Sequence, residues 1–160
     1  MNGASNEHTN RPATPGDHFD VQAVADHYLH VVNKLAATEH VPRTQAARWI
    51  TEMAKYLAIA VDSDRPVAPS RAVDAAWHTF ILFTRDYAAF CADSFGRFIH
   101  HQPNASADSD PDAYPRTLAL LADRFGPPDA ELWPAVGAGG DCQGDGNCKA
   151  DCSGDCTGGS

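Results

Sequence analysis

Residues 73–103 combine several side chains of the kinds that bind metal ions in proteins. They are Asp74, His78, Cys91, His100 and His101. Imidazole nitrogen and thiolate sulfur are ordinary zinc ligands, and three protein ligands plus water would leave an open coordination position. Thiolate also binds copper. The stretch therefore predicts a transition-metal site of the zinc or copper class.

The spacing of these residues suggests a role for each. Asp74 and His78 are four residues apart, so they share one face if this segment is helical. Asp74 could be a ligand itself, or it could support His78 by accepting its other ring N–H. Neighbouring residues in an extended run point to opposite sides, so the site is expected to take only one of His100 and His101. The predicted ligand set is His78, Cys91 and one of these two histidines.

The same residues also have an interpretation without metal. Cys91 lies among three phenylalanines, and free cysteine is one of the most buried residue types. His78 could be a core histidine bonded to Asp74. A nucleophilic Cys91 would need an exposed thiol with a lowered pKa, and its aromatic neighbours argue against that.

The C-terminal segment carries a second group of thiols. Residues 137–160 are rich in Gly and Asp and contain Cys142, Cys148, Cys152 and Cys156. Four thiolates could close a zinc site or bind Cu(I), which prefers soft sulfur. Ordering such a chain costs about 1–2 kcal/mol per residue, which the metal–thiolate bonds would have to supply. A flexible tail without metal, or one that forms reversible disulfides, remains an alternative.

The elements that must position these residues are predicted to be helices. Ser70 is a good N-cap and Gly96 a good C′ residue, while Thr84 either starts a new helix between them or lies within a longer one. No segment shows clean period-2 alternation, so we expect an all-α domain of four or five helices. Apolar residues at helical spacing place these helices at residues 18–39, 43–62, 70–96 and 110–125, with one further turn at 129–133.

The chain of 160 residues has room for one domain with two tails. We expect a disordered arm at 1–17, the helical domain at 18–134 and a flexible tail at 135–160. The net charge of −9 would repel phosphate backbones, so nucleic acid is not an expected partner. No apolar run is long enough to cross a bilayer and no secretory signal is recognisable, so we predict a cytoplasmic protein without a membrane partner.

A longer pattern runs through the same region. It reads V-D-x-x-W-H at 73–78, I-L-x-T-x-x-Y-x-x-x-C at 81–91, and a glycine with an H-H-x-P ending at 96–103. This pattern resembles the signature of the glycine-rich domain-containing protein-like family, whose small bacterial members carry a similar Gly- and Cys-rich tail. The resemblance implies a fold and a cluster of signature residues, and it implies no activity.

These observations lead to one main hypothesis and two alternatives. The main hypothesis is a metal-binding protein with a site in the domain and a second, softer site at the tail thiols. The first alternative is a structural or interaction module that binds another protein without metal. The second is a metal-dependent enzyme. The sequence has no P-loop, nucleophile elbow or dinucleotide motif, so binding is favoured over catalysis.

Overall fold

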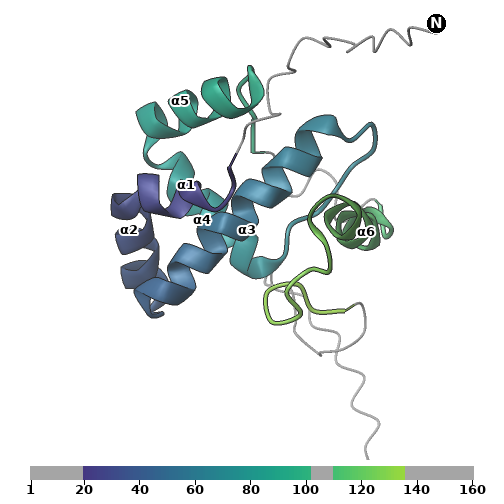
Figure 1. The fold of residues 1–160 in the computed structure, drawn as a ribbon, viewed down its shortest axis with the longest axis horizontal. Coiled ribbons are helices and arrows are strands. Elements are labelled where there is room, and N and C mark those ends of the chain that lie inside the picture. The colour runs from purple at the N-terminus through teal and green to yellow at the C-terminus, as the bar shows by residue number, and fades with distance from the viewer. Residues whose placement is uncertain (1–19, 102–109, 136–160) are drawn as a thin grey trace, which may run out of the picture.

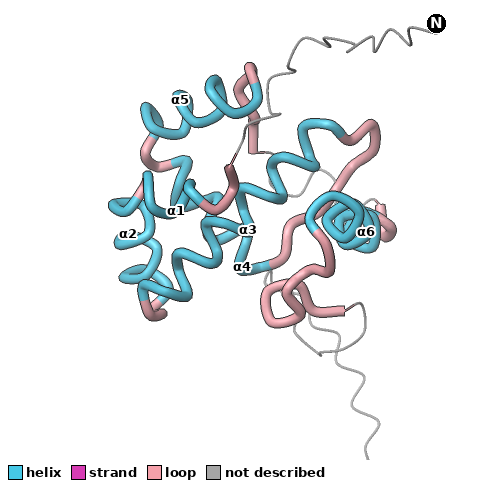
Figure 2. The backbone as a smooth tube through the Cα atoms, viewed as in Figure 1, coloured by secondary structure: helices cyan, strands magenta, loops and turns pink. Residues whose placement is uncertain are grey.

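The computed structural model describes residues 20–101 and 110–135, and within these ranges the protein is built from helices alone (Figures 1 and 2). The all-α prediction is therefore confirmed for this part of the chain. The predicted N-terminal arm and nearly all of the predicted tail lie outside the described residues. The helices are α1 (Ala23–His27), α2 (Leu29–Glu39), α3 (Arg43–Asp62), α4 (Arg71–Ile81), α5 (Thr84–Phe95) and α6 (Ala113–Phe125).

Two of the predicted helices are each divided in two, which raises the number of helices among the described residues to six. Tyr28 separates α1 from α2, because its backbone angles (φ −110°, ψ 49°) lie outside the helical region. Leu82 and Phe83 separate α4 from α5, and the Phe83 N–H donates to the Phe80 carbonyl in a tighter turn. The second break agrees with one of the two possibilities left open for Thr84, since α5 begins there. Apolar residues continue at helical spacing across Tyr28, so periodicity alone does not reveal the first break.

The longest helix, α3, lies at the centre of the fold and contacts α1, α2, α4 and α6 (Figure 1). Ile50, Met53 and Leu57 on this helix are completely buried. Burying a side chain of this kind contributes about 1.5–3 kcal/mol, so the stripe along α3 supplies much of the hydrophobic stabilisation. Because α4 packs directly on α3, the residues that α4 carries are held on a rigid base.

The beginning of α4 is fixed by a cap and by a buried threonine. Ser70 accepts a hydrogen bond from the Val73 N–H at 3.4 Å, as the sequence predicts. Just before it, the Ala68 N–H donates to the Thr117 hydroxyl at 3.0 Å, and that hydroxyl donates to the Ala68 carbonyl at 2.8 Å. Thr117 belongs to α6 and is completely buried. It therefore ties α6 to the segment that leads into α4.

The end of α5 also follows the prediction. Gly96 adopts the left-handed conformation (φ 68°), and its N–H donates to the Ala92 carbonyl at 3.0 Å. Glycine adopts this conformation without steric cost, which makes it the usual residue at this position. Residues 98–101, which follow, are in neither a helix nor a strand.

The turn predicted at 129–133 is present and docks on α3. The N–H groups of Leu132 and Trp133 both donate to the Asp129 carbonyl. The Trp133 indole N–H donates to the buried Glu52 carboxylate at 2.8 Å, and Lys55 pairs with the same carboxylate at 2.6 Å. The two partners offset the cost of burying this charge.

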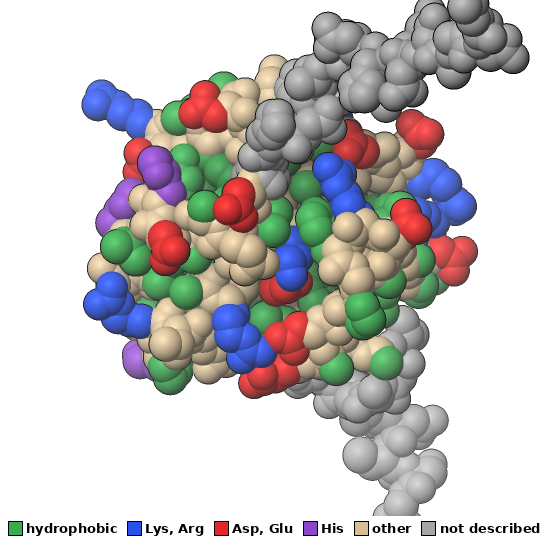
Figure 3. Space-filling model, in the orientation of Figure 1, with side chains coloured by type: hydrophobic (Ala, Val, Ile, Leu, Met, Phe, Trp, Pro, Cys, Tyr) green, Lys and Arg blue, Asp and Glu red, His purple; other side chains and the backbone are tan. Residues whose placement is uncertain are grey.

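The surface carries charges of both signs. Acidic and basic side chains are interspersed with apolar ones over the face drawn in Figure 3. No helix in the described part of the chain combines the length and the apolar composition that crossing a membrane requires.

Replacing Thr117 with Val tests the link between α6 and the entry to α4. The substitution preserves the shape of the side chain but leaves the buried Ala68 N–H without its partner. We expect the free energy of unfolding to fall by about 1–3 kcal/mol. Urea denaturation followed by circular dichroism measures it. Thr51→Val, at a half-exposed position of α3, is the control and should change the value by less than about 0.5 kcal/mol.

Candidate metal site

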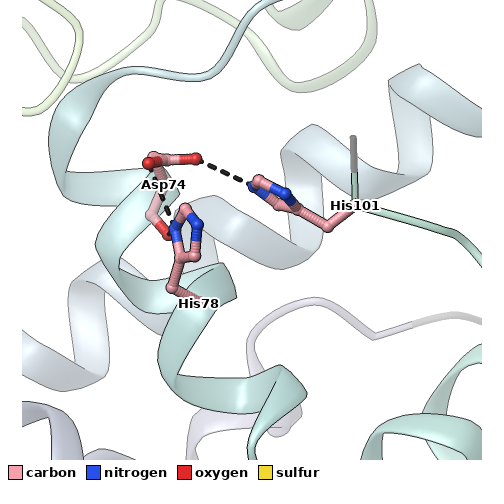
Figure 4. Close-up of side chains that lie close together, drawn as sticks. All are labelled: Asp74, His78 and His101. Carbon is pink, nitrogen blue, oxygen red and sulfur yellow. Dashed lines mark hydrogen bonds and ion pairs between the residues drawn. The ribbon is translucent and has the colours of Figure 1, made fainter. Parts of the chain in front are cut away.

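Asp74, His78 and His101 lie together at one place on the protein (Figure 4). One potential ligand atom from each residue lies within 4.8 Å of the other two. Nδ1 of His78 is 3.1 Å from Oδ2 of Asp74, and Nε2 of His101 is 3.1 Å from Oδ1 of the same carboxylate. The two imidazoles therefore share one carboxylate.

The three residues reach this point in different ways. Asp74 and His78 are one helical turn apart on α4, so the backbone of a single helix places them on the same face. The His78 Nδ1 atom also lies 2.9 Å from the Asp74 backbone carbonyl, which fixes its ring close to the helix. His101 comes from the segment after α5, and the chain must return to α4 to bring it there.

The site is open to solvent on one side and packed on the other. The exposed fraction of the side chain is 53% for His78 and 39% for Asp74, but only 12% for His101. The His101 ring lies against the Trp77 ring, with centroids 4.3 Å apart at an angle of 63°. It lies equally close to the His78 ring. The buried side fixes His101, while the open side leaves access for water or a small ligand.

The spacing of the atoms suits a metal as well as a hydrogen bond. Tetrahedral zinc with bonds of about 2.0–2.1 Å places neighbouring ligand atoms about 3.3–3.4 Å apart. The two observed nitrogen–oxygen distances of 3.1 Å are close to this value. A hydrogen bond to a carboxylate covers the same range. The two contacts involve different oxygens of Asp74, and the His78 Nδ1 atom also lies 2.9 Å from the Asp74 backbone carbonyl, so the side chains would have to rearrange for one metal ion to bind all three residues.

Cys91 does not join this group. It lies on α5 and is completely buried. Burial raises the pKa of the Cys91 thiol, and the nearby Ile99 backbone and Tyr87 hydroxyl offset part of that rise. A buried, protonated thiol is a poor nucleophile and a poor metal ligand.

His100 also lies apart from the group, since the structure brings only His101 to Asp74 and His78. His100 is exposed, and its ring packs against that of Phe98 at 4.8 Å. The group thus contains a carboxylate where the sequence suggested a thiolate. The four tail cysteines of the predicted second site lie outside the described residues.

A buried hydrogen-bond chain that the sequence does not predict lies behind the site. The Trp77 indole N–H donates to the Tyr87 hydroxyl at 2.8 Å, and this hydroxyl donates to the Ile99 carbonyl at 2.7 Å. Burial raises the pKa of Tyr87, so the hydroxyl keeps its proton and remains a donor. A signal for the chain did exist, because buried Trp and Tyr need hydrogen-bond partners.

The fold and the cluster together define an all-helical protein with a partly exposed group of two histidines and one carboxylate. A model of the family named UCP032817-like matches residues 23–115, and the chain belongs to this family. The assignment to the glycine-rich domain-containing protein-like family is therefore wrong. The match extends from α1 into the first turn of α6 and includes all three residues of the cluster. No curated protein and no solved structure matches the chain.

The environment of Cys91 predicts low reactivity. Because burial raises its pKa, less thiolate is present at a given pH than for a free cysteine. We expect iodoacetamide at pH 8 to leave Cys91 unmodified in the folded protein and to alkylate it in urea. Peptide mass spectrometry measures the alkylation of Cys91 separately from that of the other cysteines. Alkylation of the folded protein at the rate of an unstructured peptide would contradict its burial.

Proposed function

We propose that this protein binds a divalent transition-metal ion through His78, His101 and Asp74. The observation that carries the proposal is the convergence of two imidazoles and one carboxylate, from two separate segments, at one solvent-accessible point. Imidazole and carboxylate bind Zn²⁺ at about 2.0–2.2 Å, and the same ligand set holds non-haem Fe(II). Zn²⁺ is the first ion to test, since Cu(I) favours sulfur ligands.

Charge also favours a cation at this site. The carboxylate carries the negative charge of the group, and the chain as a whole has a net charge of −9. Three protein ligands would leave at least one coordination position for water. The exposed fractions of His78 and Asp74 make that position accessible. This open position makes a metal-dependent enzyme the second candidate.

The same contacts would have a different meaning in an interaction module without metal. Asp74 would then serve only to fasten the segment that carries His101 to α4, by accepting hydrogen bonds from both imidazoles. This alternative explains the two short distances, but it needs no solvent-accessible side to the cluster. The two possibilities differ in one measurable property, which is retention of a metal ion.

Metal content measured by mass spectrometry tests the proposal. The four tail cysteines are first changed to serine in the full-length chain, so that any metal retained belongs to the domain. After incubation with Zn²⁺ and gel filtration, we expect about one equivalent per chain. His101→Ala, His78→Ala and Asp74→Asn should each lower the affinity for Zn²⁺ at least tenfold, since each removes one of three ligands.

His100→Ala is the matched control, because it removes the neighbouring histidine, which lies outside the cluster. It should retain zinc like the parent protein. Absence of zinc in the parent after reconstitution would reject the proposal in favour of the module without metal. If His100→Ala and His101→Ala lost the same amount of bound zinc, the metal would not be bound at the cluster.

A further inference from the structure

Of the three clustered residues, His101 depends most on support from elsewhere. Asp74 and His78 are held on one helix, so α4 alone sets their separation. His101 is in the segment 98–101, which has no helical or sheet hydrogen bonds of its own. A metal ligand must be held to within about 0.5 Å of its productive position. Something outside this segment must therefore fix it.

The hydroxyl of Tyr87 provides that support. It donates to the Ile99 carbonyl at 2.7 Å, two residues before His101, and it accepts from the Trp77 indole at 2.8 Å. Tyr87 is 1% exposed, so water does not compete for these bonds. The segment that carries His101 is thus fastened to α5 at Ile99.

Trp77 connects this support to the site itself. The edge of its indole bonds to Tyr87, while its ring packs against that of His101 at 4.3 Å. It also lies on α4 between Asp74 and His78. The hydrogen-bond chain therefore begins on the helix that carries two of the cluster residues and ends beside the third.

We propose that Tyr87 is a positioning residue of this site: its hydroxyl, acting through the Ile99 carbonyl, sets where His101 lies relative to Asp74 and His78. The expected effect of Tyr87 on metal affinity rests on the proposed function above. Its effect on the position of His101 is independent of that function and can be measured in the protein without metal.

Tyr87→Phe tests this inference, with Tyr56→Phe as its control. Both tyrosines are buried beside Trp77, and each donates to a backbone carbonyl, but the Tyr56 hydroxyl bonds to Val67 at 3.3 Å and not to Ile99. The Tyr56→Phe substitution keeps the ring that packs against Trp77, so it controls for the loss of a buried hydroxyl at this place. In the full-length chain with serines in the tail, we expect Tyr87→Phe to bind Co²⁺ about 10–100-fold more weakly. Its visible Co²⁺ spectrum should shift toward that of His101→Ala. Tyr56→Phe should keep the affinity and spectrum of the parent.

Equal effects of the two substitutions on affinity and spectrum would overturn the positioning role. If the parent binds neither Co²⁺ nor Zn²⁺, the proposed function fails. NMR spectra of the metal-free protein then test the positioning role of Tyr87. In that case Tyr87→Phe should shift the imidazole nitrogen resonances of His101 in NMR spectra, while Tyr56→Phe leaves them unchanged. Unchanged His101 resonances in Tyr87→Phe would overturn the inference independently of metal.

A measurement on the parent protein covers the case in which Tyr87→Phe does not fold. Coupling between two events is reciprocal, so if the Tyr87–Ile99 bond strengthens zinc binding, zinc must strengthen that bond. We expect exchange of the Tyr87 hydroxyl proton with solvent to slow when Zn²⁺ is added, and that of Tyr56 to stay constant. The same response in both hydroxyls, or in neither, would overturn the proposal, and zinc content measured in parallel shows whether the site was filled.

Discussion

The carboxylate of Asp74 contacts two imidazoles that come from different segments of the chain. One is His78, a single turn further along the same helix, and the other is His101, which follows a second helix and a return of the chain. A carboxylate shared in this way holds both rings in fixed orientations. It also keeps one potential ligand atom of each residue within 4.8 Å of the other two. The candidate function of the protein depends on this shared contact.

The rest of the fold holds α4 and the segment that carries His101 in fixed positions relative to each other. The buried stripe of α3 provides the base on which α4 packs, and Thr117 of α6 fixes the segment that enters α4. On the other side, the turn at Gly96 ends α5, and the Tyr87 hydroxyl secures the segment that follows. The α3 stripe, Thr117 and Tyr87 are buried, so the loss of any of these contacts would leave an unpaired polar group or a cavity. The exposed cluster is thus supported by a buried framework.

The sequence predicted the parts of this arrangement that depend on local geometry. Helical periodicity and end signals such as Ser70 and Gly96 are properties of neighbouring residues, and they gave the all-α fold and the proximity of Asp74 to His78. The break at Tyr28 was missed, because the apolar spacing continues across it. For Cys91 the sequence offered two interpretations, because its phenylalanine neighbours favour burial while the nearby histidines suggest a metal ligand. In the structure it faces the core.

The choice between His100 and His101 is likewise a matter of tertiary structure. Alternation predicts that they point in opposite directions, but which of them faces α4 depends on how Tyr87 and Trp77 hold the segment. Those contacts join residues that are separated in sequence by a loop and a helix. Composition and spacing identify the candidate residues, and the packing behind them selects among the candidates.

X-ray absorption at the zinc edge identifies the atoms that bind the metal ion. The sample is the full-length chain with serines in place of the tail cysteines, loaded with Zn²⁺. We expect nitrogen and oxygen ligands at about 2.0–2.1 Å, with a multiple-scattering signature of two imidazoles that is reduced in His101→Ala. A sulfur ligand at about 2.3 Å would instead place Cys91 in the coordination shell and contradict the ligand set. Failure of the protein to retain zinc would contradict the metal site altogether.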